Sequence, residues 1–423
     1  MALSRRRKAA LIVLGFVVAS IGTVGAILWR GVPFPSPTGP HPVGRTSYHL
    51  RDASRPEIFS EAADDVRELM VTVHYPAAKA SGAPRAAYAD APLVAGIAET
   101  YNAPSLVVNS LHSHALEKPP CQPQEGGYPI VIFSPGFGQP PLFYTATLEE
   151  LASHGFIVVS VNHPYSNGVT VFPDGRVVQQ NEAGSQAEVS IDGPDKSQEP
   201  TAPAQDDVGA VWVKDVRFVL DELARLNRDD ALLAGRLNLS SVGIFGHSFG
   251  GATAARTVQI DERFRAGINM DGTDFAVTQG EGIGRPFMWF CASLHEVTDA
   301  MLAEAGKTRA WADQAIRTSQ ERTDGLLQKS ADGSLALVRG ASHQTFASDP
   351  TLLGSTFPWS WFTSGVDVGT IPGRRAVSLV DAFVVGFFRK HLQGQSVPLL
   401  DGSSGEFPEV ELQPRRPEAN SDS

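Results

Sequence analysis

The most constraining feature of this chain is the pentapeptide Gly-His-Ser-Phe-Gly at residues 246–250, which separates a short apolar run from an alanine-rich run. The apolar run Val242–Phe245 has the length and composition of a buried strand, and the residues from Ala252 onward favour a helix. At such a junction the serine takes a strained backbone conformation, and small residues on either side let strand and helix approach closely. The alternative is an ordinary glycine-rich turn with a solvated serine. The strand-turn-helix context favours a nucleophile elbow with Ser248 as the nucleophile.

The chain around this elbow alternates strand-length apolar runs with longer stretches of helical periodicity. This alternation is typical of a mostly parallel central sheet with helices on both faces. Together with the elbow it predicts the α/β class and an α/β-hydrolase fold. Helices are predicted over Ala210–Leu226 and Ala376–Leu392, where apolar side chains recur at helical spacing. Strands are predicted over Glu68–Tyr75, Pro129–Ser134, Ile157–Val161, Val242–Phe245, Ala266–Met270, Phe287–Ala292 and Leu335–Val338.

The N-terminus departs most clearly from average composition, because Arg5–Lys8 is entirely basic and Ala9–Trp29 is uncharged and mostly apolar. A helix of about 20 residues crosses the roughly 30 Å hydrocarbon core of a bilayer, whereas the apolar part of a cleaved signal has about 7 to 15 residues. The run therefore predicts one uncleaved N-terminal transmembrane helix, a signal-anchor in the cell membrane. The basic residues should stay cytoplasmic, which leaves everything after Arg30 outside the cytoplasm. The alternative is a cleaved signal and a secreted protein.

Polar and Pro-rich segments set the expected domain boundaries. Residues 1–30 are the basic stub and anchor, and the Pro- and Gly-rich residues 31–47 suit a stiff linker. The catalytic domain is expected over residues 48–412, followed by a disordered tail over 413–423. Inside the domain, residues 178–207 are rich in Gln, Ser, Pro and Asp, which predicts a mobile solvated insertion in preference to a lid.

Composition excludes several classes of function. The formal net charge of −11 comes from acids spread along the chain, whereas a nucleic-acid partner requires a concentrated basic face. Only Cys121 and Cys291 are present, too few for a disulfide framework or, without several histidines, a zinc site. We therefore expect no metal and no other cofactor. Cys291 is expected to be a small core residue, with an export-dependent disulfide to Cys121 as the alternative. The oligomeric state is left open.

A serine nucleophile needs a histidine to accept its proton and a carboxylate to hold that histidine in the right tautomer. In this fold the order along the chain is serine, acid, histidine. His343 fits best among the histidines after Ser248, because it lies in a loop between the last predicted strand and the last predicted helix. For the acid, Asp271 at the end of a predicted strand is favoured slightly over Glu296 or Asp299, which follow the next strand.

The oxyanion of a tetrahedral intermediate requires backbone amide donors that are already in position. Phe249, directly after the nucleophile, is expected to supply one of them. The second is assigned to Phe137, in the glycine-containing loop 134–138 that follows an early predicted strand. The alternative for this loop is an ordinary Pro-Gly turn.

Several segments together resemble the platelet-activating-factor acetylhydrolase family of α/β-hydrolases, from about Gly39 to the last predicted helix. The resemblance implies that the acid follows the strand after the nucleophile helix, which favours Asp271 clearly over Glu296. It also supports Phe137 and Phe249 as oxyanion donors. The segments are Arg67–Leu69 through Tyr75-Pro76, Phe133–Gly138, Leu151–Phe156, Gly246–Gly251, Met270–Gly272 and Ser342–Phe346.

The chain departs from the family at Ser134-Pro135-Gly136, where the family commonly has Ser-His-Gly. Proline has no amide hydrogen and fixes its own φ, so the shape of this loop is expected to differ. The resemblance implies a serine carboxylic ester hydrolase that acts without calcium on short-chain or oxidised acyl esters of glycerophospholipids, or on other small esters and polyesters. The expected partner is therefore a small-molecule or lipid ester. The alternative from another class is a non-catalytic surface binding protein that keeps the fold.

Overall fold

The computed structural model describes residues 34–78, 82–185, 208–274, 281–293, 299–304, 306–356, 365–402 and 404–415, with a few isolated residues before 34. The strands are β1 (Val43–Pro56), β2 (Val66–Pro76), β3 (Arg85–Ala87), β4 (His112–Glu117), β5 (Tyr128–Ser134), β6 (Ile157–Asn162), β7 (Val169–Val171), β8 (Val177–Gln179), β9 (Leu237–His247), β10 (Phe264–Met270), β11 (Phe287–Ala292), β12 (Gly333–Val338) and β13 (Val410–Arg415). The α-helices are α2 (Ala91–Thr100), α3 (Ser105–Asn109), α4 (Thr145–Ser153), α5 (Glu182–Ser185), α7 (Val208–Asp229), α8 (Phe249–Ile260), α9 (Asp299–Glu304), α10 (Arg309–Gln328), α11 (Ser348–Gly354) and α12 (Gly373–Gln393). Short 3₁₀ turns are η1 (Pro141–Tyr144), η2 (His343–Phe346) and η4 (Pro398–Leu400).

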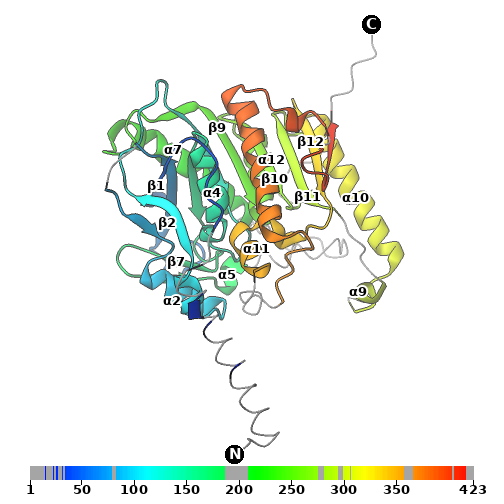
Figure 1. Ribbon diagram of the computed structural model, residues 1–423, viewed down its shortest axis with the longest axis horizontal. Coiled ribbons are helices and arrows are strands. Elements are labelled where there is room, and N and C mark those ends of the chain that lie inside the picture. Colours follow the sequence, from blue (N-terminus) through cyan, green and yellow to red (C-terminus); the bar gives the residue numbers. More distant parts are fainter. Residues whose placement is uncertain are drawn as a thin grey trace, which may run out of the picture.

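Within the described residues, one sheet runs in the order β13-β12-β11-β10-β9-β5-β6-β2-β1-β4-β3 (Figure 1). The strands from β12 to β6 in this order are each parallel to their neighbours. Antiparallel strands flank this block, with β13 beside β12 and β2 beside β6. Because parallel strands end at the same edge of a sheet, the loops after β5, β9, β10 and β12 meet at one edge.

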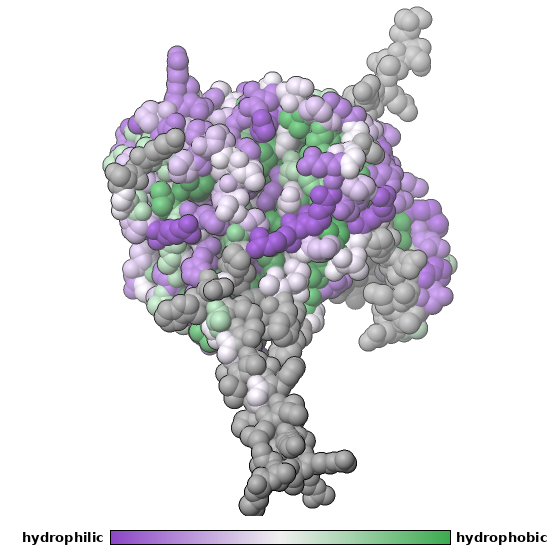
Figure 2. Space-filling view, viewed as in Figure 1, coloured by the Kyte–Doolittle hydropathy of each residue, from purple (hydrophilic) through white to green (hydrophobic). Residues whose placement is uncertain are grey.

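Helices cover both faces of the sheet and bury its apolar side chains in two core layers. On one face α4 and α12 pack against the sheet, and in Figure 1 α12 lies over the middle of the sheet. On the other face lie α7, α8 and α10. The central strand β5 is buried at every position, as expected for a strand covered on both faces. Figure 2 shows hydrophilic side chains over most of the viewed surface, with apolar groups mainly in the hollows between them.

The predicted α/β class and mostly parallel sheet are confirmed. Each predicted strand lies within one of β2, β5, β6 and β9 to β12, and the two predicted helices lie within α7 and α12. These segments were recognisable because the strands are almost continuously apolar and the helices carry one apolar stripe. In α7 that stripe is buried against the sheet, through Val216, Val219, Leu220, Leu223 and Leu226.

Three expected boundaries need correction. Strand β1 begins at Val43, inside the predicted linker, and pairs with β2 from Val43 opposite Pro76 onward. Strand β13 runs to Arg415, into the predicted tail, and pairs with β12. Both strands alternate buried and exposed residues, so neither contains the continuous apolar run by which the other strands were predicted. Pairing with a neighbouring strand makes them strands.

The insertion expected over residues 178–207 is also partly ordered. Strand β8 pairs with β7, and α5 follows it, whereas residues 186–207 lie outside the described residues. Cys121 is buried, Cys291 is half-buried, and both are free thiols, so the alternative of a disulfide between them is not realised.

Among the described residues, no helix combines the length and the hydropathy that crossing a membrane requires. The predicted anchor Ala9–Trp29 lies almost entirely outside these residues.

Candidate active site

Ser248 occupies a sharp turn between β9 and α8, with φ 54° and ψ −121°. No side chain fits two residues before it, because a Cβ on Gly246 would lie 2.1 Å from the carbonyl oxygen of Gly250. A Cβ on Gly250 would lie 2.1 Å from the carbonyl oxygen of Ser134 on the neighbouring strand. The glycines of the pentapeptide are therefore required for the close packing of β9, α8 and the loop after β5.

Three residues that are far apart in the sequence meet at the sheet edge. The Ser248 Oγ lies 2.9 Å from His343 Nε2 at the start of η2. The His343 Nδ1 lies 2.6 Å from an Asp271 Oδ2 just after β10. With its proton on Nδ1, His343 donates to the carboxylate and accepts from the serine hydroxyl. This order of contacts is the one required to remove the proton from a serine hydroxyl.

Backbone contacts hold the carboxylate in place. Asp271 has φ 53°, its amide donates to the carbonyl of Phe290, and its Oδ1 accepts from the amide of Ala292 at 2.9 Å. Its side chain is 18 % exposed, whereas that of His343 is 47 % exposed. The imidazole therefore faces an accessible surface while its acid partner is largely enclosed.

The other acid and base candidates lie elsewhere or outside the described residues. Asp299 begins α9 and pairs with Arg309 at 2.7 Å. Glu296 lies outside the described residues. His391 lies in α12, 3.6 Å from Asp332, and burial lowers its pKa to about 4.

The two predicted oxyanion donors are neighbours beside Ser248. Phe249 is the first residue of α8, and Phe137 lies in the loop after β5, with the two ring centroids 5.5 Å apart. Within this loop, Gln139 N donates to Gly136 O at 3.0 Å. Two further contacts anchor Gly138, whose amide donates to Ser166 O at 3.0 Å and whose carbonyl accepts from Tyr101 Oη at 2.5 Å. The departure at Pro135 is thus accommodated in a tightly hydrogen-bonded turn.

The sequence matches the family described as platelet-activating factor acetylhydrolase, isoform II, over residues 27–200 and 216–397. The chain belongs to this family. A probable 1-alkyl-2-acetylglycerophosphocholine esterase of Arthroderma benhamiae is 25% identical over 400 residues, covering 89% of this chain and 92% of that protein. The platelet-activating factor acetylhydrolase of Cavia porcellus is 35% identical over 164 residues, which are 36% of either chain.

A solved structure shares both fold and sequence with this chain. It is a ferulic acid esterase from Streptomyces cinnamoneus, with a TM-score of 0.71 and 28% identity, covering 90% of this chain and 99% of that chain. The predicted family and the predicted class, a carboxylic ester hydrolase, are thereby confirmed.

One contact of this acetylhydrolase-family site was missed by the sequence analysis, although it lies within the pentapeptide. His247 is fully buried, and its Nε2 lies 2.9 Å from the carbonyl oxygen of His343 while its Nδ1 lies 2.7 Å from Tyr144 Oη. Burial holds the pKa of His247 well below its usual range, so the ring is neutral. It then donates to the His343 carbonyl and accepts from Tyr144, which fixes the backbone of the catalytic-base candidate.

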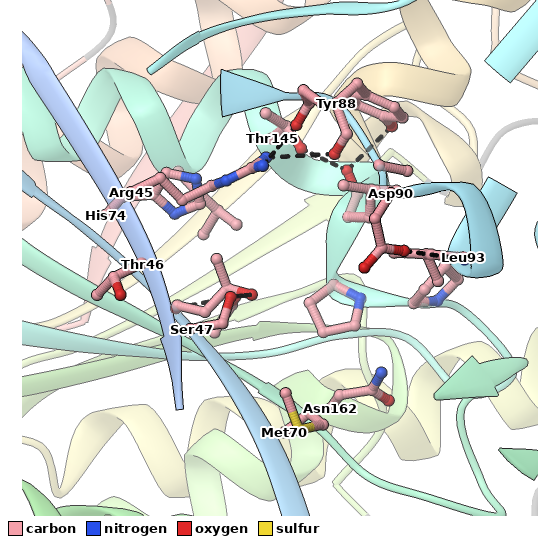
Figure 3. A pocket seen from close by; sticks show the side chains of 18 of the residues that line it. Arg45, Thr46, Ser47, Met70, His74, Tyr88, Asp90, Leu93, Thr145 and Asn162 are labelled. Carbon is pink, nitrogen blue, oxygen red and sulfur yellow. Dashed lines mark hydrogen bonds between the residues drawn. The ribbon is translucent and has the colours of Figure 1, made fainter. Parts of the chain in front are cut away.

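Two cavities lie near this edge. An apolar cavity of about 380 Å³ opens between α2, α3 and α11, and Gln139 and Gln344 from the loops beside the site line one side of it. Gln139 Nε2 donates to Gln344 Oε1 at 2.7 Å. A second cavity of about 350 Å³, with a mixed polar and apolar lining, lies over β1 and β2, where Arg45 and His74 face it (Figure 3). None of Ser248, His343, Asp271, Phe137 and Phe249 lines either cavity.

Proposed function

We propose that this esterase hydrolyses short-chain or oxidised acyl esters, including those of glycerophospholipids, through an acyl-enzyme formed on Ser248. The contact chain from Asp271 through His343 to Ser248 carries this proposal. His343 takes the proton of the Ser248 hydroxyl as that oxygen attacks the ester carbonyl, and returns it to the leaving alcohol. Asp271 keeps the His343 proton on Nδ1 and stabilises the imidazolium that forms.

The negative charge of each tetrahedral intermediate falls on the former carbonyl oxygen. The backbone amides of Phe137 and Phe249 donate to this oxygen. After the alcohol leaves, water attacks the acyl-enzyme with His343 as base, and the carboxylic acid is released as Ser248 regains its proton.

The apolar cavity beside Gln139 and Gln344 receives the chain of the substrate in this proposal. Its wall includes Val107, Val108 and Leu353, and Val366 stands 41 % exposed beside it. One relative is named for a glycerophosphocholine ester and the solved relative for ferulic acid esters, and both kinds of substrate agree with an apolar subsite.

Replacing Val366 with Asp should therefore slow the hydrolysis of butyryl esters more than that of acetyl esters. The matched control is Val177→Asp, at a similarly exposed valine in β8.

The decisive experiment compares Ser248, just after β9, with Ser240, in the first half of that strand. The Ser248→Ala variant should lose nearly all hydrolysis of p-nitrophenyl acetate and butyrate, whereas the exposed Ser240→Ala variant should keep it. A fluorophosphonate probe should label the wild type and not Ser248→Ala. Retained activity in Ser248→Ala would overturn the assigned nucleophile, and an unlabelled, inactive wild type would indicate a binding module.

The substrate class needs a separate panel. The panel holds acetyl to butyryl esters of p-nitrophenol, the matching glycerophospholipids, a feruloyl ester, and palmitoyl esters as the long-chain limit. We expect the short-chain esters to be hydrolysed faster than the palmitoyl esters. A preference for palmitoyl over acetyl phospholipid would contradict the proposed short-chain specificity.

We also propose that Ala9–Trp29 anchors the enzyme in the membrane with the catalytic part outside the cytoplasm. The length of this uncharged run and the basic residues before it support the proposal. Full-length protein should remain in the membrane pellet after carbonate extraction, and a variant starting at Gly31 should be released. Recovery of a shortened mature chain from the medium would favour the cleaved signal.

A further inference from the structure

We infer that the stacked pair His163 and Trp212 is a positioning unit that holds both oxyanion donors of the proposed site. The inference rests on the proposed function, because it concerns the amides of Phe137 and Phe249. Neither His163 nor Trp212 forms a hydrogen bond with Ser248, His343 or Asp271.

The indole of Trp212 is the common contact of the two donor residues. Trp212 lies in α7 and is fully buried. The Phe249 ring meets it edge-on with centroids 4.8 Å apart, and the Phe137 ring lies nearly parallel to it at 6.3 Å and 21°. The Trp212 side chain from α7 therefore packs against one donor residue in the loop after β5 and one at the start of α8, and its removal would release both.

His163 fixes the position of that indole. Its ring stacks on Trp212 with centroids 4.0 Å apart and 9° between the planes. His163 Nδ1 lies 2.9 Å from Asp215 Oδ2, one helical turn along α7 from Trp212. His163 therefore contacts α7 twice, by stacking on the Trp212 indole and through the Asp215 carboxylate, so rotation of the indole would disrupt the stack.

Burial and neighbouring charges set the protonation states of His163 and Asp215. Burial lowers the pKa of His163, which keeps its ring neutral, with Nδ1–H donating to Asp215. Burial alone would raise the pKa of Asp215, but the charge of Arg67 and the bond from His163 outweigh it and keep the carboxyl ionised. Arg67 is itself buried and binds Asp215 at 2.7 Å and Glu57 at 2.7 Å. The buried charges are thus paired, as a rigid group requires.

The other side of His163 holds the oxyanion loop directly. Its Nε2 accepts from Ser134 Oγ at 3.1 Å, at the start of the loop. Its amide donates to Asn167 Oδ1 at 2.6 Å, and Asn167 Nδ2 lies 3.4 Å from the carbonyl oxygen of Gly136. Together with the bond from Gly138 N to Ser166 O, the turn after β6 holds the loop at three points around Phe137.

This arrangement predicts a selective kinetic effect. Donors displaced by a fraction of an ångström bind the tetrahedral oxyanion less well, whereas the ground-state ester is little affected. Loss of the positioning unit should therefore lower kcat and leave KM nearly unchanged. It should also weaken binding of a trifluoromethyl ketone, which forms a tetrahedral adduct with the serine.

The test measures kcat, KM and the trifluoromethyl ketone inhibition constant for Trp212→Phe and His163→Phe in the full chain. We expect kcat to fall about 10- to 100-fold, KM to stay within about twofold, and the inhibition constant to rise by the factor by which kcat/KM falls. If His163→Phe does not fold, Trp212→Phe decides alone, because it leaves the bonds of His163 intact. Phe264→Leu, in the core below α8 and away from the site, controls for lost stability.

Three outcomes would overturn the inference: wild-type kcat in Trp212→Phe, a loss confined to KM with an unchanged inhibition constant, or a loss equal to that of Phe264→Leu. Ser248→Ala is measured beside them to separate the two levels of proposal. Activity in Ser248→Ala would contradict the proposed function itself. An inactive Ser248→Ala with an unaffected Trp212→Phe removes only the positioning role.

Discussion

Ser248–His343–Asp271 and Ser134–His163–Asp215 connect the same three residue types in the same order. The serine-to-imidazole distances are 2.9 and 3.1 Å, and the imidazole-to-carboxylate distances are 2.6 and 2.9 Å. In the first chain the imidazole side chain is 47 % exposed, whereas in the second it is 0 % exposed. Hydrogen-bond geometry alone therefore does not distinguish a proton relay from a buried scaffold.

The two serines differ in backbone and the two aspartates differ in charge environment. Ser248 stands at φ 54° on a strand-to-helix turn, while Ser134 is the last, fully buried residue of β5. Asp271 accepts a backbone amide bond from Ala292, whereas Asp215 forms an ion pair with Arg67. An accessible imidazole suits proton transfer to and from a substrate, and a neutral imidazole bonded to a buried ion pair suits a rigid scaffold.

The largest expected difference between the chains is in catalysis. Asp271→Asn should lower kcat about 10⁴-fold, because an amide at this position favours the wrong tautomer of His343. Steady-state hydrolysis of p-nitrophenyl butyrate measures this. Asp299→Asn, at the rejected acid candidate, should stay within about twofold of wild type. Equal losses in the two variants would show that the acid has been misassigned.

For the stability of the protein, the buried Asp215 should matter more than Asp271. Asp215→Asn should lower the free energy of unfolding by about 3 to 5 kcal/mol, because it leaves the buried Arg67 charge without its main partner. Asp271→Asn should cost about 1 kcal/mol or less, since its carboxylate is partly exposed. Urea denaturation followed by tryptophan fluorescence measures both. Comparable destabilisation of the two variants would remove the distinction between scaffold and site.

The pH dependence of stability offers a finer comparison. Burial lowers the pKa of His163, so the folded state excludes a proton that the unfolded imidazole binds near pH 6.5. Stability is complete above this pH and falls below it by about 1.4 kcal/mol per pH unit for one such histidine. His163→Phe should reduce the slope of the unfolding free energy just below pH 6.5, down to the lowered pKa of the folded imidazole, and Phe264→Leu should leave that slope unchanged. An unaltered slope in His163→Phe would show that this imidazole is protonated in the folded protein.

The smallest expected effect is that of Ser134→Ala. This change removes one hydrogen bond to His163, a contribution of about 1 kcal/mol, and leaves the Trp212 stack in place. We expect kcat to fall less than about tenfold and fluorophosphonate labelling of Ser248 to persist. Loss of labelling in this variant would mean that Ser134, not Ser248, carries the reactive hydroxyl.

Much of the fold could be predicted because the burial of its central strands and helices follows from the pattern of apolar residues within each segment. β5 is apolar throughout and α7 has a single apolar stripe, so each predicts its own burial. β1 and β13 were missed because half of each strand faces solvent, and only pairing with β2 and β12 makes them strands. His247 was missed although it stands in the elbow, since the motif does not indicate that its ring supports the His343 backbone.

The sequence by itself determined the elbow, the order of Ser248, Asp271 and His343, and the family, because these depend on residue types within short segments and on their succession along parallel strands. The tertiary structure alone decided which serine, histidine and aspartate would be enclosed. Arg67 and Asp215 are 148 positions apart and meet only when the sheet closes against α7. Burial and charge pairing of that kind arise from strand order and packing, which no local pattern of residues contains.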